Sequence, residues 1–469
     1  MRATPLIMAA SAVGLATALA AGRPSNYYYS HPPHYVSMMR SPDWWDSGEL
    51  TGDWGGLRNT FYDNGVNIFA NYTNNIAGNP AGGKSAGFTY CDNIAFGLEL
   101  DLEKIIGWKG GHLTVSGLNR DGSSLSEKKI GNQFTVQQVF GGSAVMFYAL
   151  SLDQKLWEDK ISIKIGRFAT GDDFASSPIY WLYMNNGIDG NPQALPVNTQ
   201  FSAYPWAVWA ARMRVEPTPE CNAMIGIYQI SDRIFDRSYH GLGWSMRSND
   251  SILLISQFGW TPQFFKRPVS EVGAPAPKEK AAASGQSIVA KMSAKDVAGA
   301  SEPKGLPGHY WFGAYWSPWE FPQFGTNETA TNSYGFYWHA DQMVFPEAPG
   351  SEQGLTVWSA FVLSPPQNIA KLPFQVNGGL VYRGLIPGRD DDYACFGVVY
   401  GKFSRNFART VANTGEGYPN YELVFEWNYK IQLTKFAFVQ PDIQWVINPG
   451  GTNRIPNALV LGAQMGVVF

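Results

Sequence analysis

The C-terminal part of the chain alternates between apolar and polar positions. Between Tyr421 and Leu433 every odd-numbered residue is apolar, and the positions between them are mostly polar. A period of two places the two sets of side chains on opposite faces of one strand. At about 3.3 Å per residue such a strand reaches about 43 Å, and when tilted by about 40° it is long enough to cross a bilayer. The pattern is therefore typical of a strand in a membrane barrel.

The same alternation recurs along most of the chain. It is visible over residues 94–103, 160–165, 209–215 and 374–383, and again in the last two strands, which end on the C-terminal Phe469. Trp and Tyr gather near strand ends, as expected of residues at a membrane interface. Soluble strands usually have only about 5–6 residues. The pattern therefore favours a membrane barrel over a soluble sandwich.

Counting back from Phe469 gives sixteen candidate strands. An even number suits a bacterial barrel with both termini in the periplasm. We predict an all-β fold, a transmembrane antiparallel β-barrel of about 16 strands. The expected strands are residues 64–75, 91–103, 109–118, 142–152, 160–168, 206–215, 220–232, 252–261, 308–317, 332–340, 354–363, 374–384, 393–402, 421–433, 436–447 and 457–469.

Three segments fall outside the predicted wall. Residues 1–21 carry one basic residue, an Ala-rich apolar run and a small-x-small cleavage signature, which predicts a signal peptide and export. Residues 22–47 lack apolar periodicity and are expected to form a flexible leader before the barrel at 48–469. Residues 262–307 are rich in Ala, Pro, Lys and Ser, so we expect a disordered insert, which the strand count places in the periplasm.

The connection from Ala169 to Pro205 is far longer than two neighbouring strands require. The strand count makes it the third external loop. A barrel of sixteen strands encloses a wide aqueous channel unless something folds into it, so we expect this loop to bend inward and narrow the lumen. Its candidate constriction residues are Asp172, Asp173, Tyr180, Trp181, Asn185 and Asn186.

The polar faces of the predicted strands indicate which side chains line the lumen. Both signs of charge occur there, and a mixed wall favours neutral polar solutes over selection of one kind of ion. We expect the third external loop to face the basic residues of this wall. The alternative is that many of these groups only hydrate the lumen and pair across strands. The predicted lining residues are Glu99, Asp101, Arg212, Arg214, Arg383, Glu422, Glu426, Gln440 and Asp442.

The composition argues against several classes of function. A net charge of −3 gives no sign of a polyanion-binding protein, so no nucleic-acid partner is expected. The three cysteines lie more than a hundred residues apart, and the six histidines show no ligand spacing. The sequence therefore predicts neither a disulfide framework nor a metal site, and no cofactor is expected.

One Gly-rich segment matches two functional motifs. Residues Gly78–Ser85 have the spacing of a phosphate-binding P-loop, and Gly83–Gly87 match G-x-S-x-G. Both motifs require a helix directly after them, whereas the next segment here alternates like a strand. A Gly-rich surface loop is the simpler interpretation. A barrel hydrolase remains an alternative, because a Ser–His pair need not be close in sequence.

Several stretches resemble the OprB-type carbohydrate-selective porins, over about residues 48–469. They are residues 51–58 (TGDWGGLR) with 64–66, residues 166–192 with the motifs GRF, DDFA and GIDGNP, residues 306–311 (LPGHYW), and residues 421–451 with the motifs QPDIQ and NPGG. The resemblance adds Arg167 to the candidate lumen residues. The periodicity does not, because Arg167 falls on the apolar face of its strand.

The resemblance implies a sixteen-stranded barrel of the bacterial outer membrane through which glucose and other carbohydrates, and also ions, pass by diffusion. It implies no enzymatic activity. The last strand and Phe469 resemble the signal that the barrel assembly machinery recognises. The expected partners are therefore small neutral carbohydrates, outer-membrane lipid and that machinery. A monomer and a trimer both remain open, as does a non-transport barrel that acts as an adhesin or anchor.

Overall fold

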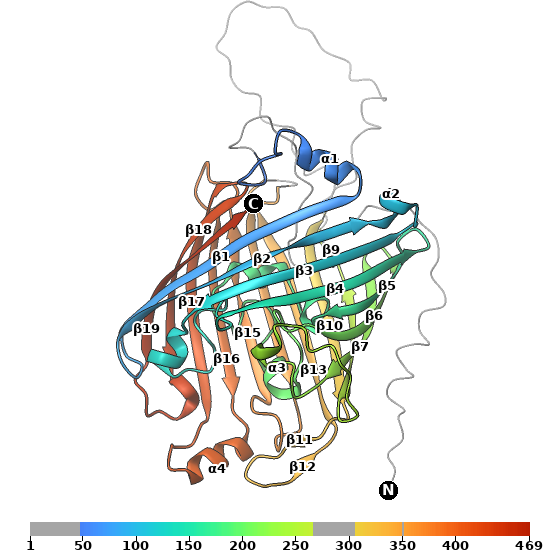
Figure 1. Cartoon of the computed structure of the whole chain (residues 1–469). Coiled ribbons are helices and arrows are strands. Elements are labelled where there is room, and N and C mark those ends of the chain that lie inside the picture. The colour runs from blue at the N-terminus through green and yellow to red at the C-terminus, as the bar shows by residue number, and fades with distance from the viewer. Residues whose placement is uncertain (1–46, 266–304, 349–350) are drawn as a thin grey trace, which may run out of the picture.

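The computed structural model describes residues 47–265, 305–348 and 351–469, which form one closed antiparallel barrel (Figure 1). Seventeen strands share one sheet, and because β9 has only two residues, sixteen strands make up the wall. The predicted fold class, an all-β barrel of sixteen strands, is confirmed. The wall strands are β1 (Val66–Ala81), β2 (Gly87–Asp101), β3 (Gly111–Gly122), β4 (Ala144–Leu156), β5 (Ile161–Phe168), β6 (Val208–Thr218), β7 (Cys221–Ile230), β8 (Ser251–Trp260), β10 (Leu306–Ser317), β13 (Ser333–Pro346), β14 (Gly354–Leu363), β15 (Phe374–Arg383), β16 (Tyr393–Lys402), β17 (Tyr421–Thr434), β18 (Ala437–Ile447) and β19 (Ala458–Val468).

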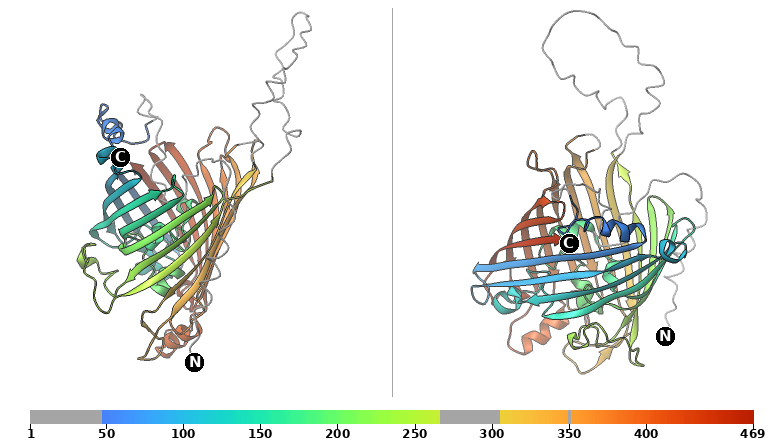
Figure 2. Two further views of the ribbon diagram at one scale, coloured as in Figure 1. Left: turned by 90° about the vertical axis from the view of Figure 1, so that its right-hand side faces the viewer. Right: turned by 45° about the horizontal axis from the view of Figure 1, so that its top comes forward.

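The barrel closes where the first strand meets the last. β1 pairs antiparallel with β19, with Asn71 opposite Val468. The Phe469 N–H donates to the Ala70 carbonyl at 2.9 Å, and the Arg58 guanidinium donates to the Phe469 carbonyl at 2.9 Å. Arg58 belongs to helix α1 (Leu57–Asp63), which lies beside the C-terminus at one end of the barrel (Figure 2). The C-terminal residue is therefore part of the closing seam.

The alternating sequence pattern corresponds to the two faces of the wall. On β17, Trp427 leaves 44% of its surface exposed on the outer face, while Glu422 and Glu426 are buried inside. On β6, Met213 is exposed outside and Arg212 is buried inside. This is the arrangement of a barrel with an apolar band outside and polar groups inside.

The first two strands extend further towards the turn that connects them than predicted, and they are shorter than predicted at their other ends. β1 continues to Ala81 and β2 begins at Gly87, so the segment with P-loop spacing is the tip of a hairpin and is followed by a strand. β2 ends at Asp101 because the Asp101 carboxylate accepts the Glu103 and Lys104 amides at 3.0 and 3.3 Å. It thereby caps the short helix α2 (Leu102–Ile106).

The β6–β7 turn and the β5–β6 connection lie at opposite ends of the barrel. Only two residues separate β6 from β7, whereas residues 169–207 separate β5 from β6. Helix α4 (Arg405–Asn413) and the small hairpin β11 (Phe321–Pro322) and β12 (Thr329–Ala330) lie at the end opposite to α1 (Figure 1). Within the described residues no helix is both long enough and apolar enough to span a membrane.

The predicted insert at 262–307 has paired strand residues at both of its margins. The two-residue strand β9 (Gln263–Phe264) pairs with the beginning of β10, with Phe264 opposite Leu306. Residues 266–304 between these margins lie outside the described residues. So do the predicted signal peptide and the predicted leader up to residue 46.

Candidate functional site

The connection between β5 and β6, residues 169–207, folds into the barrel and is here called the inner loop. It contains short helical turns, among them α3 (Ala194–Thr199), which lies within the ring of strands (Figure 1). Tyr180, Tyr183 and Asn185 of the inner loop are fully buried. The loop is therefore packed inside the barrel.

One side of the inner loop is fixed to the wall formed by β15 to β18. The Met184 and Asn185 amides donate to the two carboxylate oxygens of Glu426 at 2.6 and 3.1 Å. The Asn185 side chain donates to the Gln444 carbonyl at 2.9 Å, and Gln440 donates to the Leu182 carbonyl at 3.1 Å. Charge-assisted hydrogen bonds of this kind are among the stronger ones, so this side of the loop is firmly held.

A second segment, the β3–β4 connection at residues 123–143, also enters the lumen. The Gln133 and Phe134 amides both donate to Glu422 at 2.8 Å. This segment also pairs with the inner loop, since the Asn186 amide donates to the Thr135 carbonyl at 2.8 Å. This inward path could not be predicted, because residues 123–143 have no periodicity that would mark it.

The predicted lumen residues of β17 and β18 therefore face inward but are bonded to protein. Glu422, Glu426, Gln440 and Asp442 are at most 2% exposed. Asp442 accepts from the Gln444 amide at 2.8 Å. Glu422, Glu426 and Gln440 fasten loops in the lumen and Asp442 bonds to its wall neighbour, so few of their polar atoms are available to a passing solute.

The opposite side of the inner loop is fixed by a cluster of charges. The Arg212 guanidinium lies 3.2 Å from Asp173 of the loop and 3.2 Å from Asp153 of β4. Lys164 lies 3.3 Å from the other oxygen of Asp173. We expected this loop to lie close to the basic residues of β6. It does so at Arg212, where the contact is a buried network of ion pairs.

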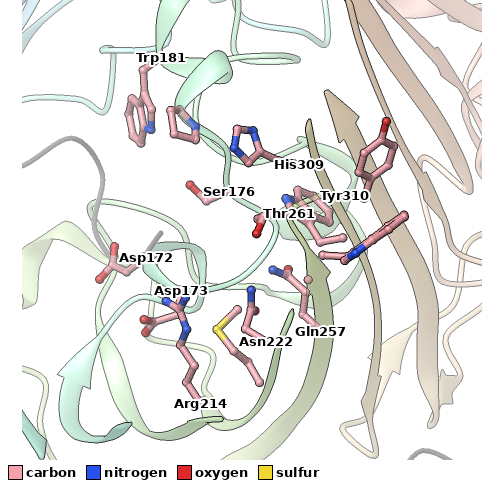
Figure 3. Close-up of a pocket in the computed structure, with 15 residues that line it drawn as sticks. Asp172, Asp173, Ser176, Trp181, Arg214, Asn222, Gln257, Thr261, His309 and Tyr310 are labelled. Atoms are coloured by element: carbon pink, nitrogen blue, oxygen red, sulfur yellow. The ribbon is translucent and has the colours of Figure 1, made fainter. Parts of the chain in front are cut away.

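A recess in the lumen lies beside this cluster, between the inner loop and strands β6, β7, β8 and β10 (Figure 3). We call it the lumen recess; together with the solvent-filled space onto which it opens, it measures about 620 Å³. Arg214 lies on its wall and pairs with Glu216 at 2.7 Å. Its polar and aromatic lining includes Asp172, Asp173, Ser176, Trp181, Arg214, Asn222, Gln257, Thr261, His309 and Trp311.

Two acidic residues of the inner loop, the half-buried Asp172 and the buried Asp189, have raised pKa values. Asp172 accepts hydrogen bonds from the Tyr148 hydroxyl and from the Ala169 amide. Burial raises the pKa of Asp172. Burial also raises the pKa of Asp189 well above its ordinary value, and Asp189 Oδ1 has no hydrogen-bond partner in the described part of the chain. Both carboxyls are therefore easier to protonate than carboxyls in water.

Three predicted lumen residues lie near the barrel end that holds α1 and Phe469. Arg383 pairs with Glu352 at 2.5 Å and with Asp391 at 2.9 Å in neighbouring turns. Glu99 accepts from the Asn67 amide at 3.0 Å. Asp101 lies at the end of its strand, where its carboxylate caps α2 by accepting hydrogen bonds from the helix amides.

The structure places Arg167 on the outward-facing side of β5, as the strand alternation indicates. It lies on the same face as the exposed Ile163 and Ile165. Its guanidinium donates to the Ala207 carbonyl at 2.8 Å and to the Gly241 carbonyl at 3.4 Å. The alternation along β5 therefore predicted its direction correctly.

The wall has a gap where the inner loop leaves β5, and Arg167 binds the segments that close this gap. β5 pairs with β4 only as far as Leu150, so residues 144–149 of β4 have no β5 partner. The β7–β8 connection at residues 231–250, here called the seam loop, covers that edge. The Phe147 amide donates to the His240 carbonyl at 2.9 Å, and His240 Nδ1 lies 2.8 Å from the Val145 carbonyl.

A chain of polar groups that the sequence analysis missed connects the wall to the inner loop. Asp341 lies 2.6 Å from His309 Nδ1 and 2.8 Å from His339 Nε2. The other nitrogen of His339 lies 2.9 Å from the Tyr180 hydroxyl. The signal was present, because His339 and Asp341 are two residues apart and therefore share the inward face of one strand.

Comparisons with known proteins agree with this architecture. Porin B of Pseudomonas aeruginosa is 25% identical over 444 residues, which cover 90% of this chain and 91% of that protein. A putative porin, QuiX, of Acinetobacter baylyi is 24% identical over 461 residues, with 92% and 96% covered. The high-pH structure of Pseudomonas putida OprB superposes with a TM-score of 0.77 at 23% identity, covering 90% of this chain and 99% of that one.

The family described as "Carbohydrate-selective porin, OprB family" matches residues 85–469, which is most of the chain. The barrel with polar groups inside and apolar groups outside is the fold expected of an outer-membrane channel. The chain therefore belongs to the OprB family of carbohydrate-selective porins, which are channels of the bacterial outer membrane and not enzymes.

Proposed function

We propose that glucose and other small neutral sugars diffuse through this lumen, and that the inner loop sets the size of solute that passes. The observation that carries the proposal is the attachment of the inner loop on both sides, to Glu426 on one side and to Arg212 on the other. A loop held across the lumen limits the free cross-section, whereas an empty barrel of sixteen strands is wide.

The distribution of charge supports a neutral solute. Asp173 is paired with Lys164 and Arg212, and Arg214 is paired with Glu216. Paired charges produce a weak net field, so a simple ion gains little there. Sugar hydroxyls can still exchange hydrogen bonds with such groups, because a hydroxyl both donates and accepts.

A change at the Glu426 anchor tests this proposal. Glu426→Ala removes the acceptor of two loop amides, and hydrogen bonds to a charged group are worth about 1.5–3 kcal/mol each. We expect the middle of the inner loop to loosen, ion conductance in planar bilayers to rise, and maltohexaose to enter proteoliposomes faster relative to glucose.

The matched control is Glu352→Ala, which removes a carboxylate that is 81% exposed in a turn at the end of the barrel. We expect this variant to conduct and to admit sugars like the unchanged protein. If Glu426→Ala retained the same conductance and the same ratio of glucose to maltohexaose uptake, the inner loop would not be the element that limits solute size.

A further inference from the structure

The outer face of the barrel carries acidic side chains at one place on β2 and β3. On β2, Ile94 and Phe96 face outward and are 37% and 44% exposed. Asp92 lies on the same face, because every second residue of a strand does, and it is directly opposite Asp121 of β3. Like charges directly opposite each other destabilise a sheet, and the outer face of such a barrel is an apolar band. This pair of carboxylates therefore points to a partner outside the wall.

Neighbouring hydroxyl groups extend the pair into a polar row. The Tyr90 hydroxyl donates to Asp92 at 2.6 Å, and the Ser143 hydroxyl, just before β4, donates to Asp121. β1, β2 and β3 lie side by side on the face that Figure 1 shows. Asp121 is the next-to-last residue of β3, so the row lies near the barrel end from which the inner loop and the seam loop start. The longer loops of outer-membrane barrels are extracellular, which places the row at the level of the lipid headgroups in the outer leaflet.

The seam loop borders this row and contributes two arginines. A side chain at Gly142, next to Ser143, would collide with the guanidinium of Arg237. Arg237 is exposed and makes no side-chain hydrogen bond or ion pair within the described residues. The same holds for Arg247, further along the loop, in the part of the chain that the structure describes. Guanidinium groups bind phosphate through paired N–H donors, so both are available to an anionic group outside the wall.

The acidic residues of the seam loop are used inside the loop. Asp236 accepts hydrogen bonds from the amide and the hydroxyl of Ser238 at 2.9 and 2.7 Å. Asp232 and Asp250 lie 4.0 and 3.9 Å from the Arg233 guanidinium. These carboxylates therefore leave the two exposed guanidinium groups uncompensated.

Apolar side chains accompany these charges on the outside of the wall. Val145, Leu242 and Met246 are 59%, 61% and 69% exposed. On a surface that faces the membrane, such side chains contact acyl chains. The surface thus combines groups that suit a lipid headgroup with groups that suit lipid tails.

We propose that this surface binds one phosphorylated glycolipid of the outer leaflet. We call it the headgroup patch; its members are Tyr90, Asp92, Asp121, Arg237 and Arg247. Phosphates lie at the two arginines, and sugar hydroxyls donate to the two carboxylates. Charge complementarity selects this class of lipid, because a bare phosphate is repelled by the carboxylates, whereas the hydroxyls of a glycolipid supply them with further donors. The patch lies outside the barrel, so the inference is independent of what passes through the lumen.

The test titrates the full-length protein in detergent with bisphosphorylated lipid A and counts bound lipid by native mass spectrometry. We expect one tightly bound lipid A on the unchanged protein. Arg237→Ala with Arg247→Ala should weaken this binding about tenfold or more, because a hydrogen bond to a charged group contributes about one factor of ten or more. Replacement of both arginines by Lys should retain most of the binding, since the positive charges remain.

A second pair of substitutions tests the recognition of hydroxyls. Asp92→Ala with Asp121→Ala should weaken binding of lipid A about tenfold. The same variant should bind dioleoyl phosphatidic acid more tightly than the unchanged protein does, because the repulsion of a bare phosphate is removed. The matched control is Lys109→Ala with Lys160→Ala, which removes two positive charges at the opposite end of the barrel and should leave binding of lipid A unchanged.

Three results would overturn the proposal. The first is unchanged binding of lipid A to the arginine variant with its heat-modifiable folded band retained; if that variant did not fold, unchanged binding to the carboxylate variant would decide in the same way. The second is equal loss of lipid A and phosphatidic acid in the arginine variant without any effect of the carboxylate variant, which would indicate a general anionic surface. The third is displacement of lipid A by millimolar inorganic phosphate, which would show that phosphate alone is recognised.

Discussion

The interaction between Arg212 and Asp173 should be one of the strongest contacts that dock the inner loop. The two charged groups lie 3.2 Å apart and each side chain is 1% exposed. With an effective dielectric constant of about 20, a pair at this separation has a Coulomb energy of about 5 kcal/mol before desolvation is counted. Removal of one partner of a buried pair destabilises a protein by about 3–5 kcal/mol, because the other charge is left without compensation.

We therefore predict that Arg212→Ala lowers the free energy of unfolding by about 3 kcal/mol. The lower end of the range applies because Lys164 still lies 3.3 Å from Asp173. The measurement is a double-mutant cycle with Arg212→Ala, Asp173→Asn and the combination, followed by urea unfolding in detergent micelles. The combined variant should be less destabilised than the sum of the two, because a neutral amide requires no counter-charge.

Arg214→Ala is the matched comparison, since Arg214 lies two residues further along β6 on the same face. Its partner Glu216 is 34% exposed, so solvent screening limits the loss of that pair to about 1 kcal/mol. Ion conductance should rise in Arg212→Ala, because the start of the inner loop is released. Additive effects in the cycle, or equal destabilisation by Arg214→Ala, would refute this account of the loop.

Three further predictions concern assembly, the long connection and pH. Deletion of Phe469 removes its hydrogen bonds to Ala70 and Arg58. Export should continue, while the amount of heat-modifiable folded barrel in the outer membrane should fall. A normal amount of folded barrel would contradict the prediction. Deletion of residues 270–303 should leave folding intact, because Phe264 and Leu306 are already paired; loss of the folded band on gels would show that the deleted segment is needed. Burial raises the pKa of Asp189, so this carboxyl stabilises the fold less as the pH rises from its unfolded pKa of about 4 through the raised folded value. Asp189→Asn should therefore raise the midpoint of urea unfolding at pH 7 but not at pH 3. Equal shifts of the midpoint at the two pH values would argue against a buried ionisable carboxyl.

The barrel wall could be predicted from the sequence because strand alternation is a local property. Met213 and Arg212 are neighbours in the chain, and a period of two alone assigns them to opposite faces. The same rule assigned Arg167 to the outer face, which the structure confirms and which the resemblance to a family did not suggest. Strand boundaries were less predictable where a side chain accepts hydrogen bonds from nearby backbone amides, as the Asp101 carboxylate does at the start of α2.

The use of the lumen residues could not be predicted in the same way. Glu426 and Met184 are 242 positions apart, and nothing in their local sequence indicates that one binds the amide of the other. The strand alternation correctly predicted that Glu422 and Gln440 face inward. However, a polar group that faces inward can contact either water or a loop. The distinction depends on the path of two irregular segments, which carry no periodic signal.

The shortness of β5 has a consequence for how such barrels can be recombined. Because the chain turns inward after Phe168, the inner loop leaves part of the β4 edge bare, and the seam loop covers it through His240. A graft that moved residues 169–207 alone into a related barrel would expose backbone N–H and C=O groups at that edge, and bare edges invite misassembly. A graft would therefore have to move the inner loop together with residues 231–250. These two segments are separate in sequence but would have to be exchanged as one unit.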